Sequence, residues 1–164
     1  MPLELAILSA LALGIGADKP VHLVVTHDSI VGAWECGPTT MKGPKFEMTV
    51  VIVTKYAADG TFESTTSSVI APSGQSAISQ IDSARGSWKL DGTILSSSFK
   101  DSKFISSSDP SISQEFGQKI RDDQLRKKSV YKSEILEIGQ TSMRMIPVES
   151  EYAEAAVESV CKRS

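Results

Sequence analysis

Few side chains in this sequence have the type and spacing of a metal centre. His22 and His27 lie close together near the N-terminus, with Asp28 next to the second, whereas zinc sites use three or four ligands. Side chains soft enough for copper are one cysteine and four methionines: Cys36, Met41, Met48, Met143 and Met145. Because methionine is more often a gap-filler in an apolar core, we expect neither a metal nor a cofactor.

The motifs of common catalytic sites are missing from the sequence. It has no Gly-x-Ser-x-Gly elbow, no phosphate-binding loop and no His-Glu-x-x-His helix. A general base would have to be a carboxylate, and the candidates alternate along predicted strands with most facing solvent: Glu47, Glu63, Glu134 and Glu137. We therefore predict a protein without catalysis, and an enzyme that uses a buried carboxylate is the third hypothesis.

The two cysteines, Cys36 and Cys161, lie far apart in the sequence. An even pair in an exported chain favours one disulfide. Such a bond would tie the first strand to a C-terminal helix and close a very long loop, which the chain-entropy model rates at roughly 4–5 kcal/mol. Two buried free thiols are the alternative for a chain that stays in the cytosol.

Residues 1–17 have the composition of a signal peptide. The apolar run 5–16 ends in small residues, and it is too short to span a bilayer. Glu4 precedes the run where a Lys or Arg is usual, and an N-terminal helix packed on the domain is the alternative interpretation. We predict export to the periplasm or the exterior, with a mature chain 18–164 and no integral membrane span.

Length, composition and charge predict one folded domain. The chain has 164 residues, of which 40% are hydrophobic and 23% charged, which suits one core but not two. Its formal net charge is −3, whereas a nucleic-acid binder usually carries a basic surplus. We therefore expect no nucleic-acid partner.

Strand patterns dominate the chain from residue 30 onward. The tripeptides Gly32-Ala33-Trp34 and Gly86-Ser87-Trp88 each begin a strand-like stretch, and residues 46–56 alternate with a period of two. Asp59-Gly60 and Asp91-Gly92 are hairpin signals. The expected strands are 30–36, 46–56, 61–70, 77–90, 93–99, 103–106, 125–138 and 141–148, with helices at 111–122 and 150–162. This pattern predicts an all-β fold, an antiparallel up-and-down β-barrel of about eight strands with a C-terminal α-helix.

The order of these motifs resembles the lipocalin-like (calycin) proteins, and most closely small exported bacterial lipocalin-like domains. The segments that carry the resemblance are Tyr56-Ala57-Ala58-Asp59-Gly60-Thr61-Phe62 and Gly86-Ser87-Trp88-Lys89-Leu90-Asp91-Gly92-Thr93-Ile94-Leu95. The resemblance covers residues 30–148. It implies that the first-strand tryptophan, Trp34, packs against an arginine of the last strand, for which Arg144 is the matching candidate.

An eight-stranded barrel is about the size at which the interior either fills with side chains or holds one small ligand. The side chains expected to point inward and bind a ligand are Phe46, Met48, Ile52, Tyr56, Phe62, Trp88, Tyr131 and Met143. The resemblance implies an exported carrier of a small hydrophobic or amphipathic molecule. The alternative is a filled barrel that contacts another protein through its loops or through the helix at 111–122, as an inhibitor or accessory subunit does.

Overall fold

The computed structural model describes residues 23–149 and 156–164. The expected signal peptide, 1–17, lies outside these residues, as does the first part of the expected C-terminal helix. Among the described residues, no helix is long and apolar enough to cross a membrane.

Eight antiparallel strands form a closed up-and-down barrel in which each strand pairs with the next and β8 returns to β1. The strands are β1 (Gly32–Gly43), β2 (Phe46–Tyr56), β3 (Thr61–Pro72), β4 (Ile78–Asp91), β5 (Ile94–Ser107), β6 (Val130–Ile138), β7 (Ser142–Val148) and β8 (Ser159–Arg163). Helix α1 (His27–Ile30) precedes β1, and α2 (Gln114–Lys127) lies between β5 and β6. The predicted all-β barrel is confirmed.

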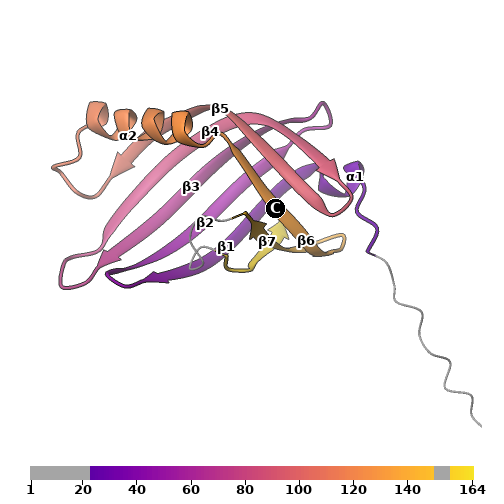
Figure 1. Ribbon diagram of the computed structural model, residues 1–164, viewed down its shortest axis with the longest axis horizontal. Coiled ribbons are helices and arrows are strands. Elements are labelled where there is room, and N and C mark those ends of the chain that lie inside the picture. The colour runs from indigo at the N-terminus through magenta and orange to yellow at the C-terminus, as the bar shows by residue number, and fades with distance from the viewer. Residues whose placement is uncertain (1–22, 150–155) are drawn as a thin grey trace, which may run out of the picture.

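The barrel has two unlike halves (Figure 1). Strands β1 to β5 are long, and β6 to β8 are short and accompany only one end of them. Pairing with β6 reaches residues 94–98 of β5, and pairing with β8 reaches residues 34–36 of β1. We call the end beside α1, where all eight strands pair, the plugged half. The rest of β1 to β5, with α2, is the long-strand half.

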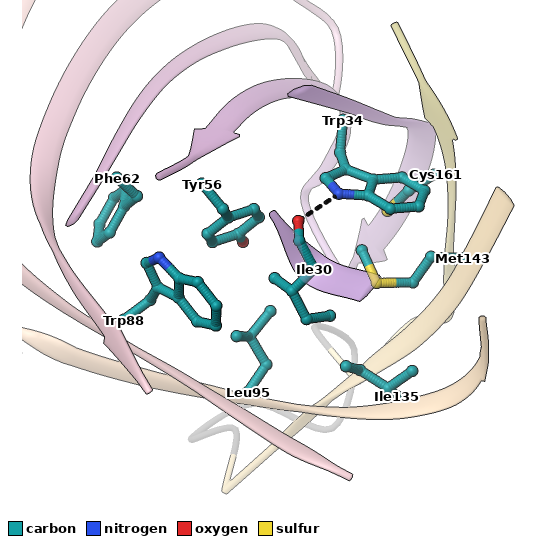
Figure 2. Close-up of a cluster of buried hydrophobic side chains, with 9 residues drawn as sticks. All are labelled: Ile30, Trp34, Tyr56, Phe62, Trp88, Leu95, Ile135, Met143 and Cys161. Carbon is teal, nitrogen blue, oxygen red and sulfur yellow. Dashed lines mark hydrogen bonds between the residues drawn. The ribbon is translucent and has the colours of Figure 1, made fainter. Parts of the chain in front are cut away.

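The plugged half contains the apolar core (Figure 2). Its buried members are Ile30, Trp34, Tyr56, Phe62, Trp88, Leu95, Ile135, Met143 and Cys161. Helix α1 closes this end because Ile30 is fully buried and its carbonyl oxygen accepts a 2.8 Å hydrogen bond from Trp34 Nε1. The same helix stacks His27 on Trp88, with ring centroids 4.5 Å apart. Both tripeptide tryptophans therefore pack against α1.

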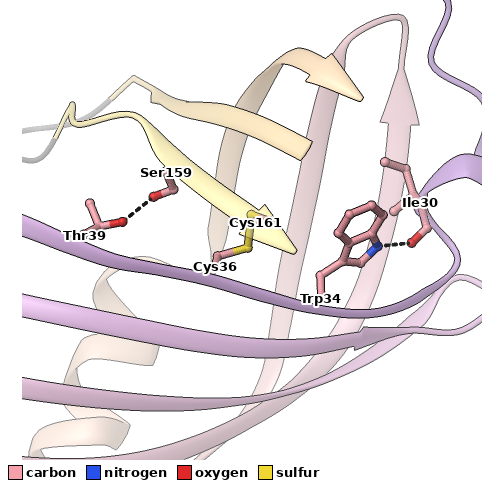
Figure 3. The surroundings of a disulfide bond; sticks show 6 residues. All are labelled: Ile30, Trp34, Cys36, Thr39, Ser159 and Cys161. Carbon is pink, nitrogen blue, oxygen red and sulfur yellow. Dashed lines mark hydrogen bonds between the residues drawn. A yellow bond between two sulfur atoms is a disulfide. The ribbon is translucent and has the colours of Figure 1, made fainter. Parts of the chain in front are cut away.

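A disulfide fastens the seam between the first and last strands (Figure 3). Cys36 of β1 and Cys161 of β8 are directly opposed in the strand register and are bonded to each other. One level further along, Thr39 Oγ1 lies 2.9 Å from Ser159 Oγ, within hydrogen-bond distance. The predicted disulfide is confirmed, although it joins two strands and not a strand and a helix.

Several expected elements differ from the structure. The first strand, expected at 30–36, is β1, which continues through a register shift between Cys36 and Thr39 to Gly43, and Ile30 belongs to α1. The helix expected at 111–122 is α2, Gln114–Lys127. The C-terminal helix expected at 150–162 is wrong over its described part, because Ser159–Arg163 forms β8 and closes the barrel. The two strands expected at 93–99 and 103–106 are one strand, β5, which runs past a register shift opposite Arg85 and Gly86. The strand expected at 125–138 begins only at Val130, because α2 extends to Lys127.

Candidate ligand-binding face of the barrel

The strand register defines which side chains point into the barrel. Cross-strand partners share a face, and residues two apart along a strand point the same way. Tyr56 pairs with Phe62 and Thr54 with Ser64, and all four are buried. The even-numbered residues of β2, β3 and β4 therefore form the inner face, and the odd-numbered residues form the outer face.

The apolar core ends midway along the inner face. On β2, Tyr56 is 8% exposed and Thr54 is 7% exposed, but the next inner residue, Ile52, is 37% exposed. Phe46, at the far end of the same strand, is 41% exposed. Solvent therefore reaches apolar side chains on the inner face of the long-strand half.

The residues expected to bind a ligand divide between the two halves. Tyr56, Phe62, Trp88 and Met143 belong to the buried core of the plugged half. Phe46, Met48 and Ile52 lie on the inner face of β2 in the long-strand half. Tyr131 is half exposed on β6 and meets Phe99 edge to face, with ring centroids 5.2 Å apart.

Across from Ile52 and Val50 of β2, the inner face of β3 and β4 is polar, whereas Met48 further along β2 pairs with Ile70 of β3. Ile52 pairs with Thr66, and Val50 pairs with Ser68. The next strand continues the row, because Thr66 pairs with Asp82 and Ser68 with Gln80. Asp82 is buried, and its Oδ2 accepts a 2.8 Å hydrogen bond from Gln80 Nε2. Beside Ile52 and Val50, an apolar strip and a polar strip thus run side by side along the same face.

Helix α2 binds the edge that β5 leaves beyond its pairing with β6. The side-chain amide of Gln118 accepts from Phe104 N at 3.0 Å and donates to Ser102 O at 2.8 Å. Gln114 Nε2 donates to Phe104 O at 2.7 Å. The two glutamines thereby supply the hydrogen bonds that a neighbouring strand would make.

Two contacts hold α2 against the inner face. Gly117 lies over the ring of Phe104, and a Cβ at Gly117 would come within 2.5 Å of that ring, so only glycine allows this approach. One turn later, Arg121 Nε lies 3.3 Å from Asp82 Oδ1. The side chains are 22% and 9% exposed, so this ion pair is largely removed from water.

Asp82 and Arg121 were not among the residues expected from the sequence. The signal for Asp82 was present, because Asp82 and Trp88 are an even number of residues apart on one strand and so share a face. Arg121 had a weaker signal: it follows Gly117 and Gln118 by one helical turn, but nothing in the sequence shows that this helix face meets β4.

Trp34 packs against Arg163. The expected contact with Arg144 is wrong. The guanidinium of Arg163 lies 4.3 Å from the ring centre of Trp34 and donates to the carbonyl oxygens of Ser29, Val31 and Gln140. A Cβ at Gly32 would come within 2.6 Å of Arg163 Nη1, so the glycine leaves room for the guanidinium. The expectation of an arginine from the last strand holds once β8 is recognised as that strand.

Arg144 forms an exposed charge cluster on the outside of the barrel. It donates to Glu158 at 2.6 Å and 3.0 Å and to Glu137 at 3.0 Å. These carboxylates raise the pKa of the Arg144 guanidinium, and its hydrogen bond lowers the pKa of Glu158. In the core, by contrast, burial raises the pKa of Tyr56 to about 12, against the weaker opposite effect of hydrogen bonds with Ser97 and Thr54.

The outer face of β2 to β5 carries charged residues and two shallow depressions. One, of about 440 Å³, is lined by residues that include Val53, Lys55, Arg85 and Lys103. The other, of about 460 Å³, adjoins it. The register also places the carboxylates considered for catalysis on the outer face: Glu47, Glu63, Glu134 and Glu137.

No protein-family model matches the chain, and no curated protein shows significant sequence similarity to it.

Proposed function

We propose that this protein binds a small hydrophobic or amphipathic molecule on the inner face of the long-strand half, without catalysis. The observation that carries the proposal is the exposure of Ile52, which is 37% although the register points it into the barrel. Soluble proteins expose single apolar residues on their outer surfaces as a matter of course. Apolar side chains on a concave inner face, beside a polar strip, are typical of a ligand site.

The polar strip supports an amphipathic ligand in particular. Ile52 and Val50 lie beside Thr66 and Ser68 along the β2–β3 pair. A molecule lying along this boundary would place an apolar body against β2 and hydrogen-bonding groups against β3. From Ile52 to Phe46 the strand rises roughly 20 Å, which accommodates an extended alkyl chain or a small fused-ring compound.

The test uses two neighbouring residues of β2 that differ in the face they occupy. Ile52 is 37% exposed on the inner face, and Val53 is 40% exposed on the outer face. The probe is N-phenyl-1-naphthylamine, an uncharged dye whose fluorescence rises in apolar surroundings. We expect Ile52→Gln to weaken dye binding about fivefold, since it removes roughly 1 kcal/mol of apolar contact. Val53→Gln is the matched control and should leave binding unchanged. Equal effects of the two variants, or no dye binding by the wild type, would overturn the proposal.

We also propose that the protein is exported and is a lipocalin-like barrel. The disulfide supports export, because disulfides persist in oxidising compartments. The up-and-down topology and the packing of Arg163 on Trp34 support the lipocalin-like relationship. Intact-mass measurement of the protein from an exporting host should give a chain that begins at Asp18. A chain of full length recovered with its leader would contradict export.

The second candidate function is contact with another protein through the outer face. Val53, Val69, Ile81 and Ile105 are each between 38% and 48% exposed there. Exposed apolar residues that gather on one face are typical of interaction sites. Val53→Gln should abolish the binding of such a partner, and Ile52→Gln should leave it unchanged. This is the reverse of the result expected for the dye.

A further inference from the structure

Charge is almost absent from the inner face of the barrel. On the described strands, alternation and register place two charged side chains on this face, Arg163 and Asp82. Arg163 belongs to the closed end, where it packs on Trp34. In the long-strand half, Asp82 is therefore the one charged residue that the described strands place on the inner face. Arg121 Nε of α2 lies 3.3 Å from Asp82 Oδ1.

The Asp82–Arg121 pair leaves the inner face of the long-strand half without an unbalanced strand charge. One carboxylate and one guanidinium balance each other, and both side chains are largely buried. A third charge placed beside them would lose its hydration without gaining a counter-ion of its own. Partial loss of hydration disfavours an ion that gains no counter-ion, so the inner face opposes a ligand with a net charge.

Hydrogen-bonding capacity, in contrast, is left over on the same face. Ser68 is 8% exposed, and Thr66 is half-buried one level nearer the core. Within the described part of the chain, neither hydroxyl has a side-chain hydrogen-bond partner. Gln80, next to Ser68 in the register, uses its amide nitrogen on Asp82 and has its amide oxygen left to accept. A polar uncharged group on a ligand would give these three side chains hydrogen-bond partners.

We propose that the ligand is an uncharged amphiphile whose head group carries hydroxyl or amide groups, and that the Asp82–Arg121 pair selects against charged head groups. The inference rests on the proposed binding function and names its ligand class. The apolar body lies against Met48, Val50 and Ile52, and the head group bonds to the hydroxyls of β3.

The experiment compares head groups on one alkyl chain. Monododecanoylglycerol, dodecanoate and dodecylammonium compete with bound N-phenyl-1-naphthylamine, below their critical micelle concentrations and at pH 7. We expect the glycerol ester to displace the dye at a concentration about tenfold lower than either charged compound, the factor that corresponds to 1.4 kcal/mol. Binding of either charged compound as tight as that of the ester would overturn the inference and leave the binding function intact. Absence of dye binding would overturn both.

Variants of the ion pair provide a second readout. In Asp82→Asn the Arg121 charge is unbalanced, and the preference should move toward dodecanoate. In Arg121→Gln the Asp82 charge is unbalanced, and the preference should move toward dodecylammonium. The double variant, in which neither charge is present, should again prefer the glycerol ester. Thermal melts establish that each variant is folded. If a variant does not fold, the comparison of the three head groups with the wild-type protein still tests the proposal.

The control is an ion pair on the outer face of the same strands. Arg85 and Asp101 lie on β4 and β5 with Arg85 Nη2 3.0 Å from Asp101 Oδ2. Arg85→Gln and Asp101→Asn change the net charge of the protein as the inner variants do. They should leave the order of the three head groups unchanged. A similar shift in preference in inner and outer variants would show that net charge, and not the inner pair, governs selection.

Discussion

The two halves of the barrel are built from the same strands but differ in what fills them. In the plugged half, inner residues such as Trp34 and Phe62 are 0% and 3% exposed. In the long-strand half, Ile52 and Phe46 point inward from the same sheet and are 37% and 41% exposed. The difference follows from the short strands, because β6 to β8 and α1 bring apolar side chains to only one end. A packed end can therefore hold the fold together while the other end keeps apolar side chains of its inner face open to solvent.

Trp34→Ala should have the largest effect on stability. The indole is fully buried and donates to the carbonyl oxygen of Ile30, so truncation should lower the free energy of unfolding by about 3–5 kcal/mol. Phe46→Ala, which removes another inner-face aromatic ring but in the long-strand half, should cost less than about 1 kcal/mol. Urea denaturation measures both. Similar losses would remove the distinction between the halves.

Removal of the disulfide should rank next. Cys36 and Cys161 are 125 residues apart in sequence, and the seam they close has only three register pairs between β1 and β8. We expect Cys36→Ser with Cys161→Ser to destabilise the protein by about 2–4 kcal/mol. Hydrogen exchange should rise first in β8. Exchange that rises first in β3 and β4 would contradict the prediction that the disulfide chiefly stabilises the seam between β1 and β8.

Alkaline pH should loosen the plugged half through Tyr56. Burial raises the pKa of this phenol to about 12 from its ordinary value of 10.0. The folded state thus favours the neutral form, and its contribution is fully present below pH 10 and lost as the pH rises toward 12. The loss should reach about 2–3 kcal/mol. Tyr56→Phe should show a smaller fall in stability over this range, and an identical fall would contradict the burial of the phenol.

The two arginines near the C-terminal strands should give the smallest and most unequal pair of effects. Arg163→Gln removes a contact with the Trp34 ring and hydrogen bonds to three carbonyl oxygens, and should cost about 1–2 kcal/mol. Arg144→Gln removes only exposed ion pairs and should have little effect. Thermal unfolding at low and high salt separates them, because salt screens the exposed ion pairs of Arg144 and Arg163 is held by carbonyl oxygens and a ring. A larger loss for Arg144 would restore the expected contact with Trp34.

The sequence was most informative where local pattern and tertiary role agree. Alternation along β2 predicted its bounds, Phe46–Tyr56, because one face of that strand is apolar except at Thr54. The last strand was missed because Tyr152, Val157 and Val160 also fit a helical stripe, and a five-residue strand has little periodicity to read. Because β8 was not predicted, β7 was the last expected strand, and its Arg144 was predicted to contact Trp34 in place of Arg163 of β8.

The inner face was predicted in part. The alternation of side chains placed Phe46, Met48 and Ile52 correctly on one face of β2. It could not show where along the strand the apolar core would end. That point depends on how far β6 and β8 extend, which is a property of long-range pairing. The contact between α2 and β4 is also long-range, and so the Asp82–Arg121 pair became visible only in the folded chain.

The most direct test of the binding function is methyl NMR of the protein with N-phenyl-1-naphthylamine. Isoleucine and methionine methyl groups report on both halves, since Ile52 and Met48 lie on the inner face of the long-strand half and Ile30, Ile135 and Met143 lie in the core. We expect the dye to shift the signals of Ile52 and Met48 and to leave the three core signals in place. Shifts confined to Ile81 and Ile105 on the outer face, or shifts of the core signals alone, would contradict a binding face inside the long-strand half.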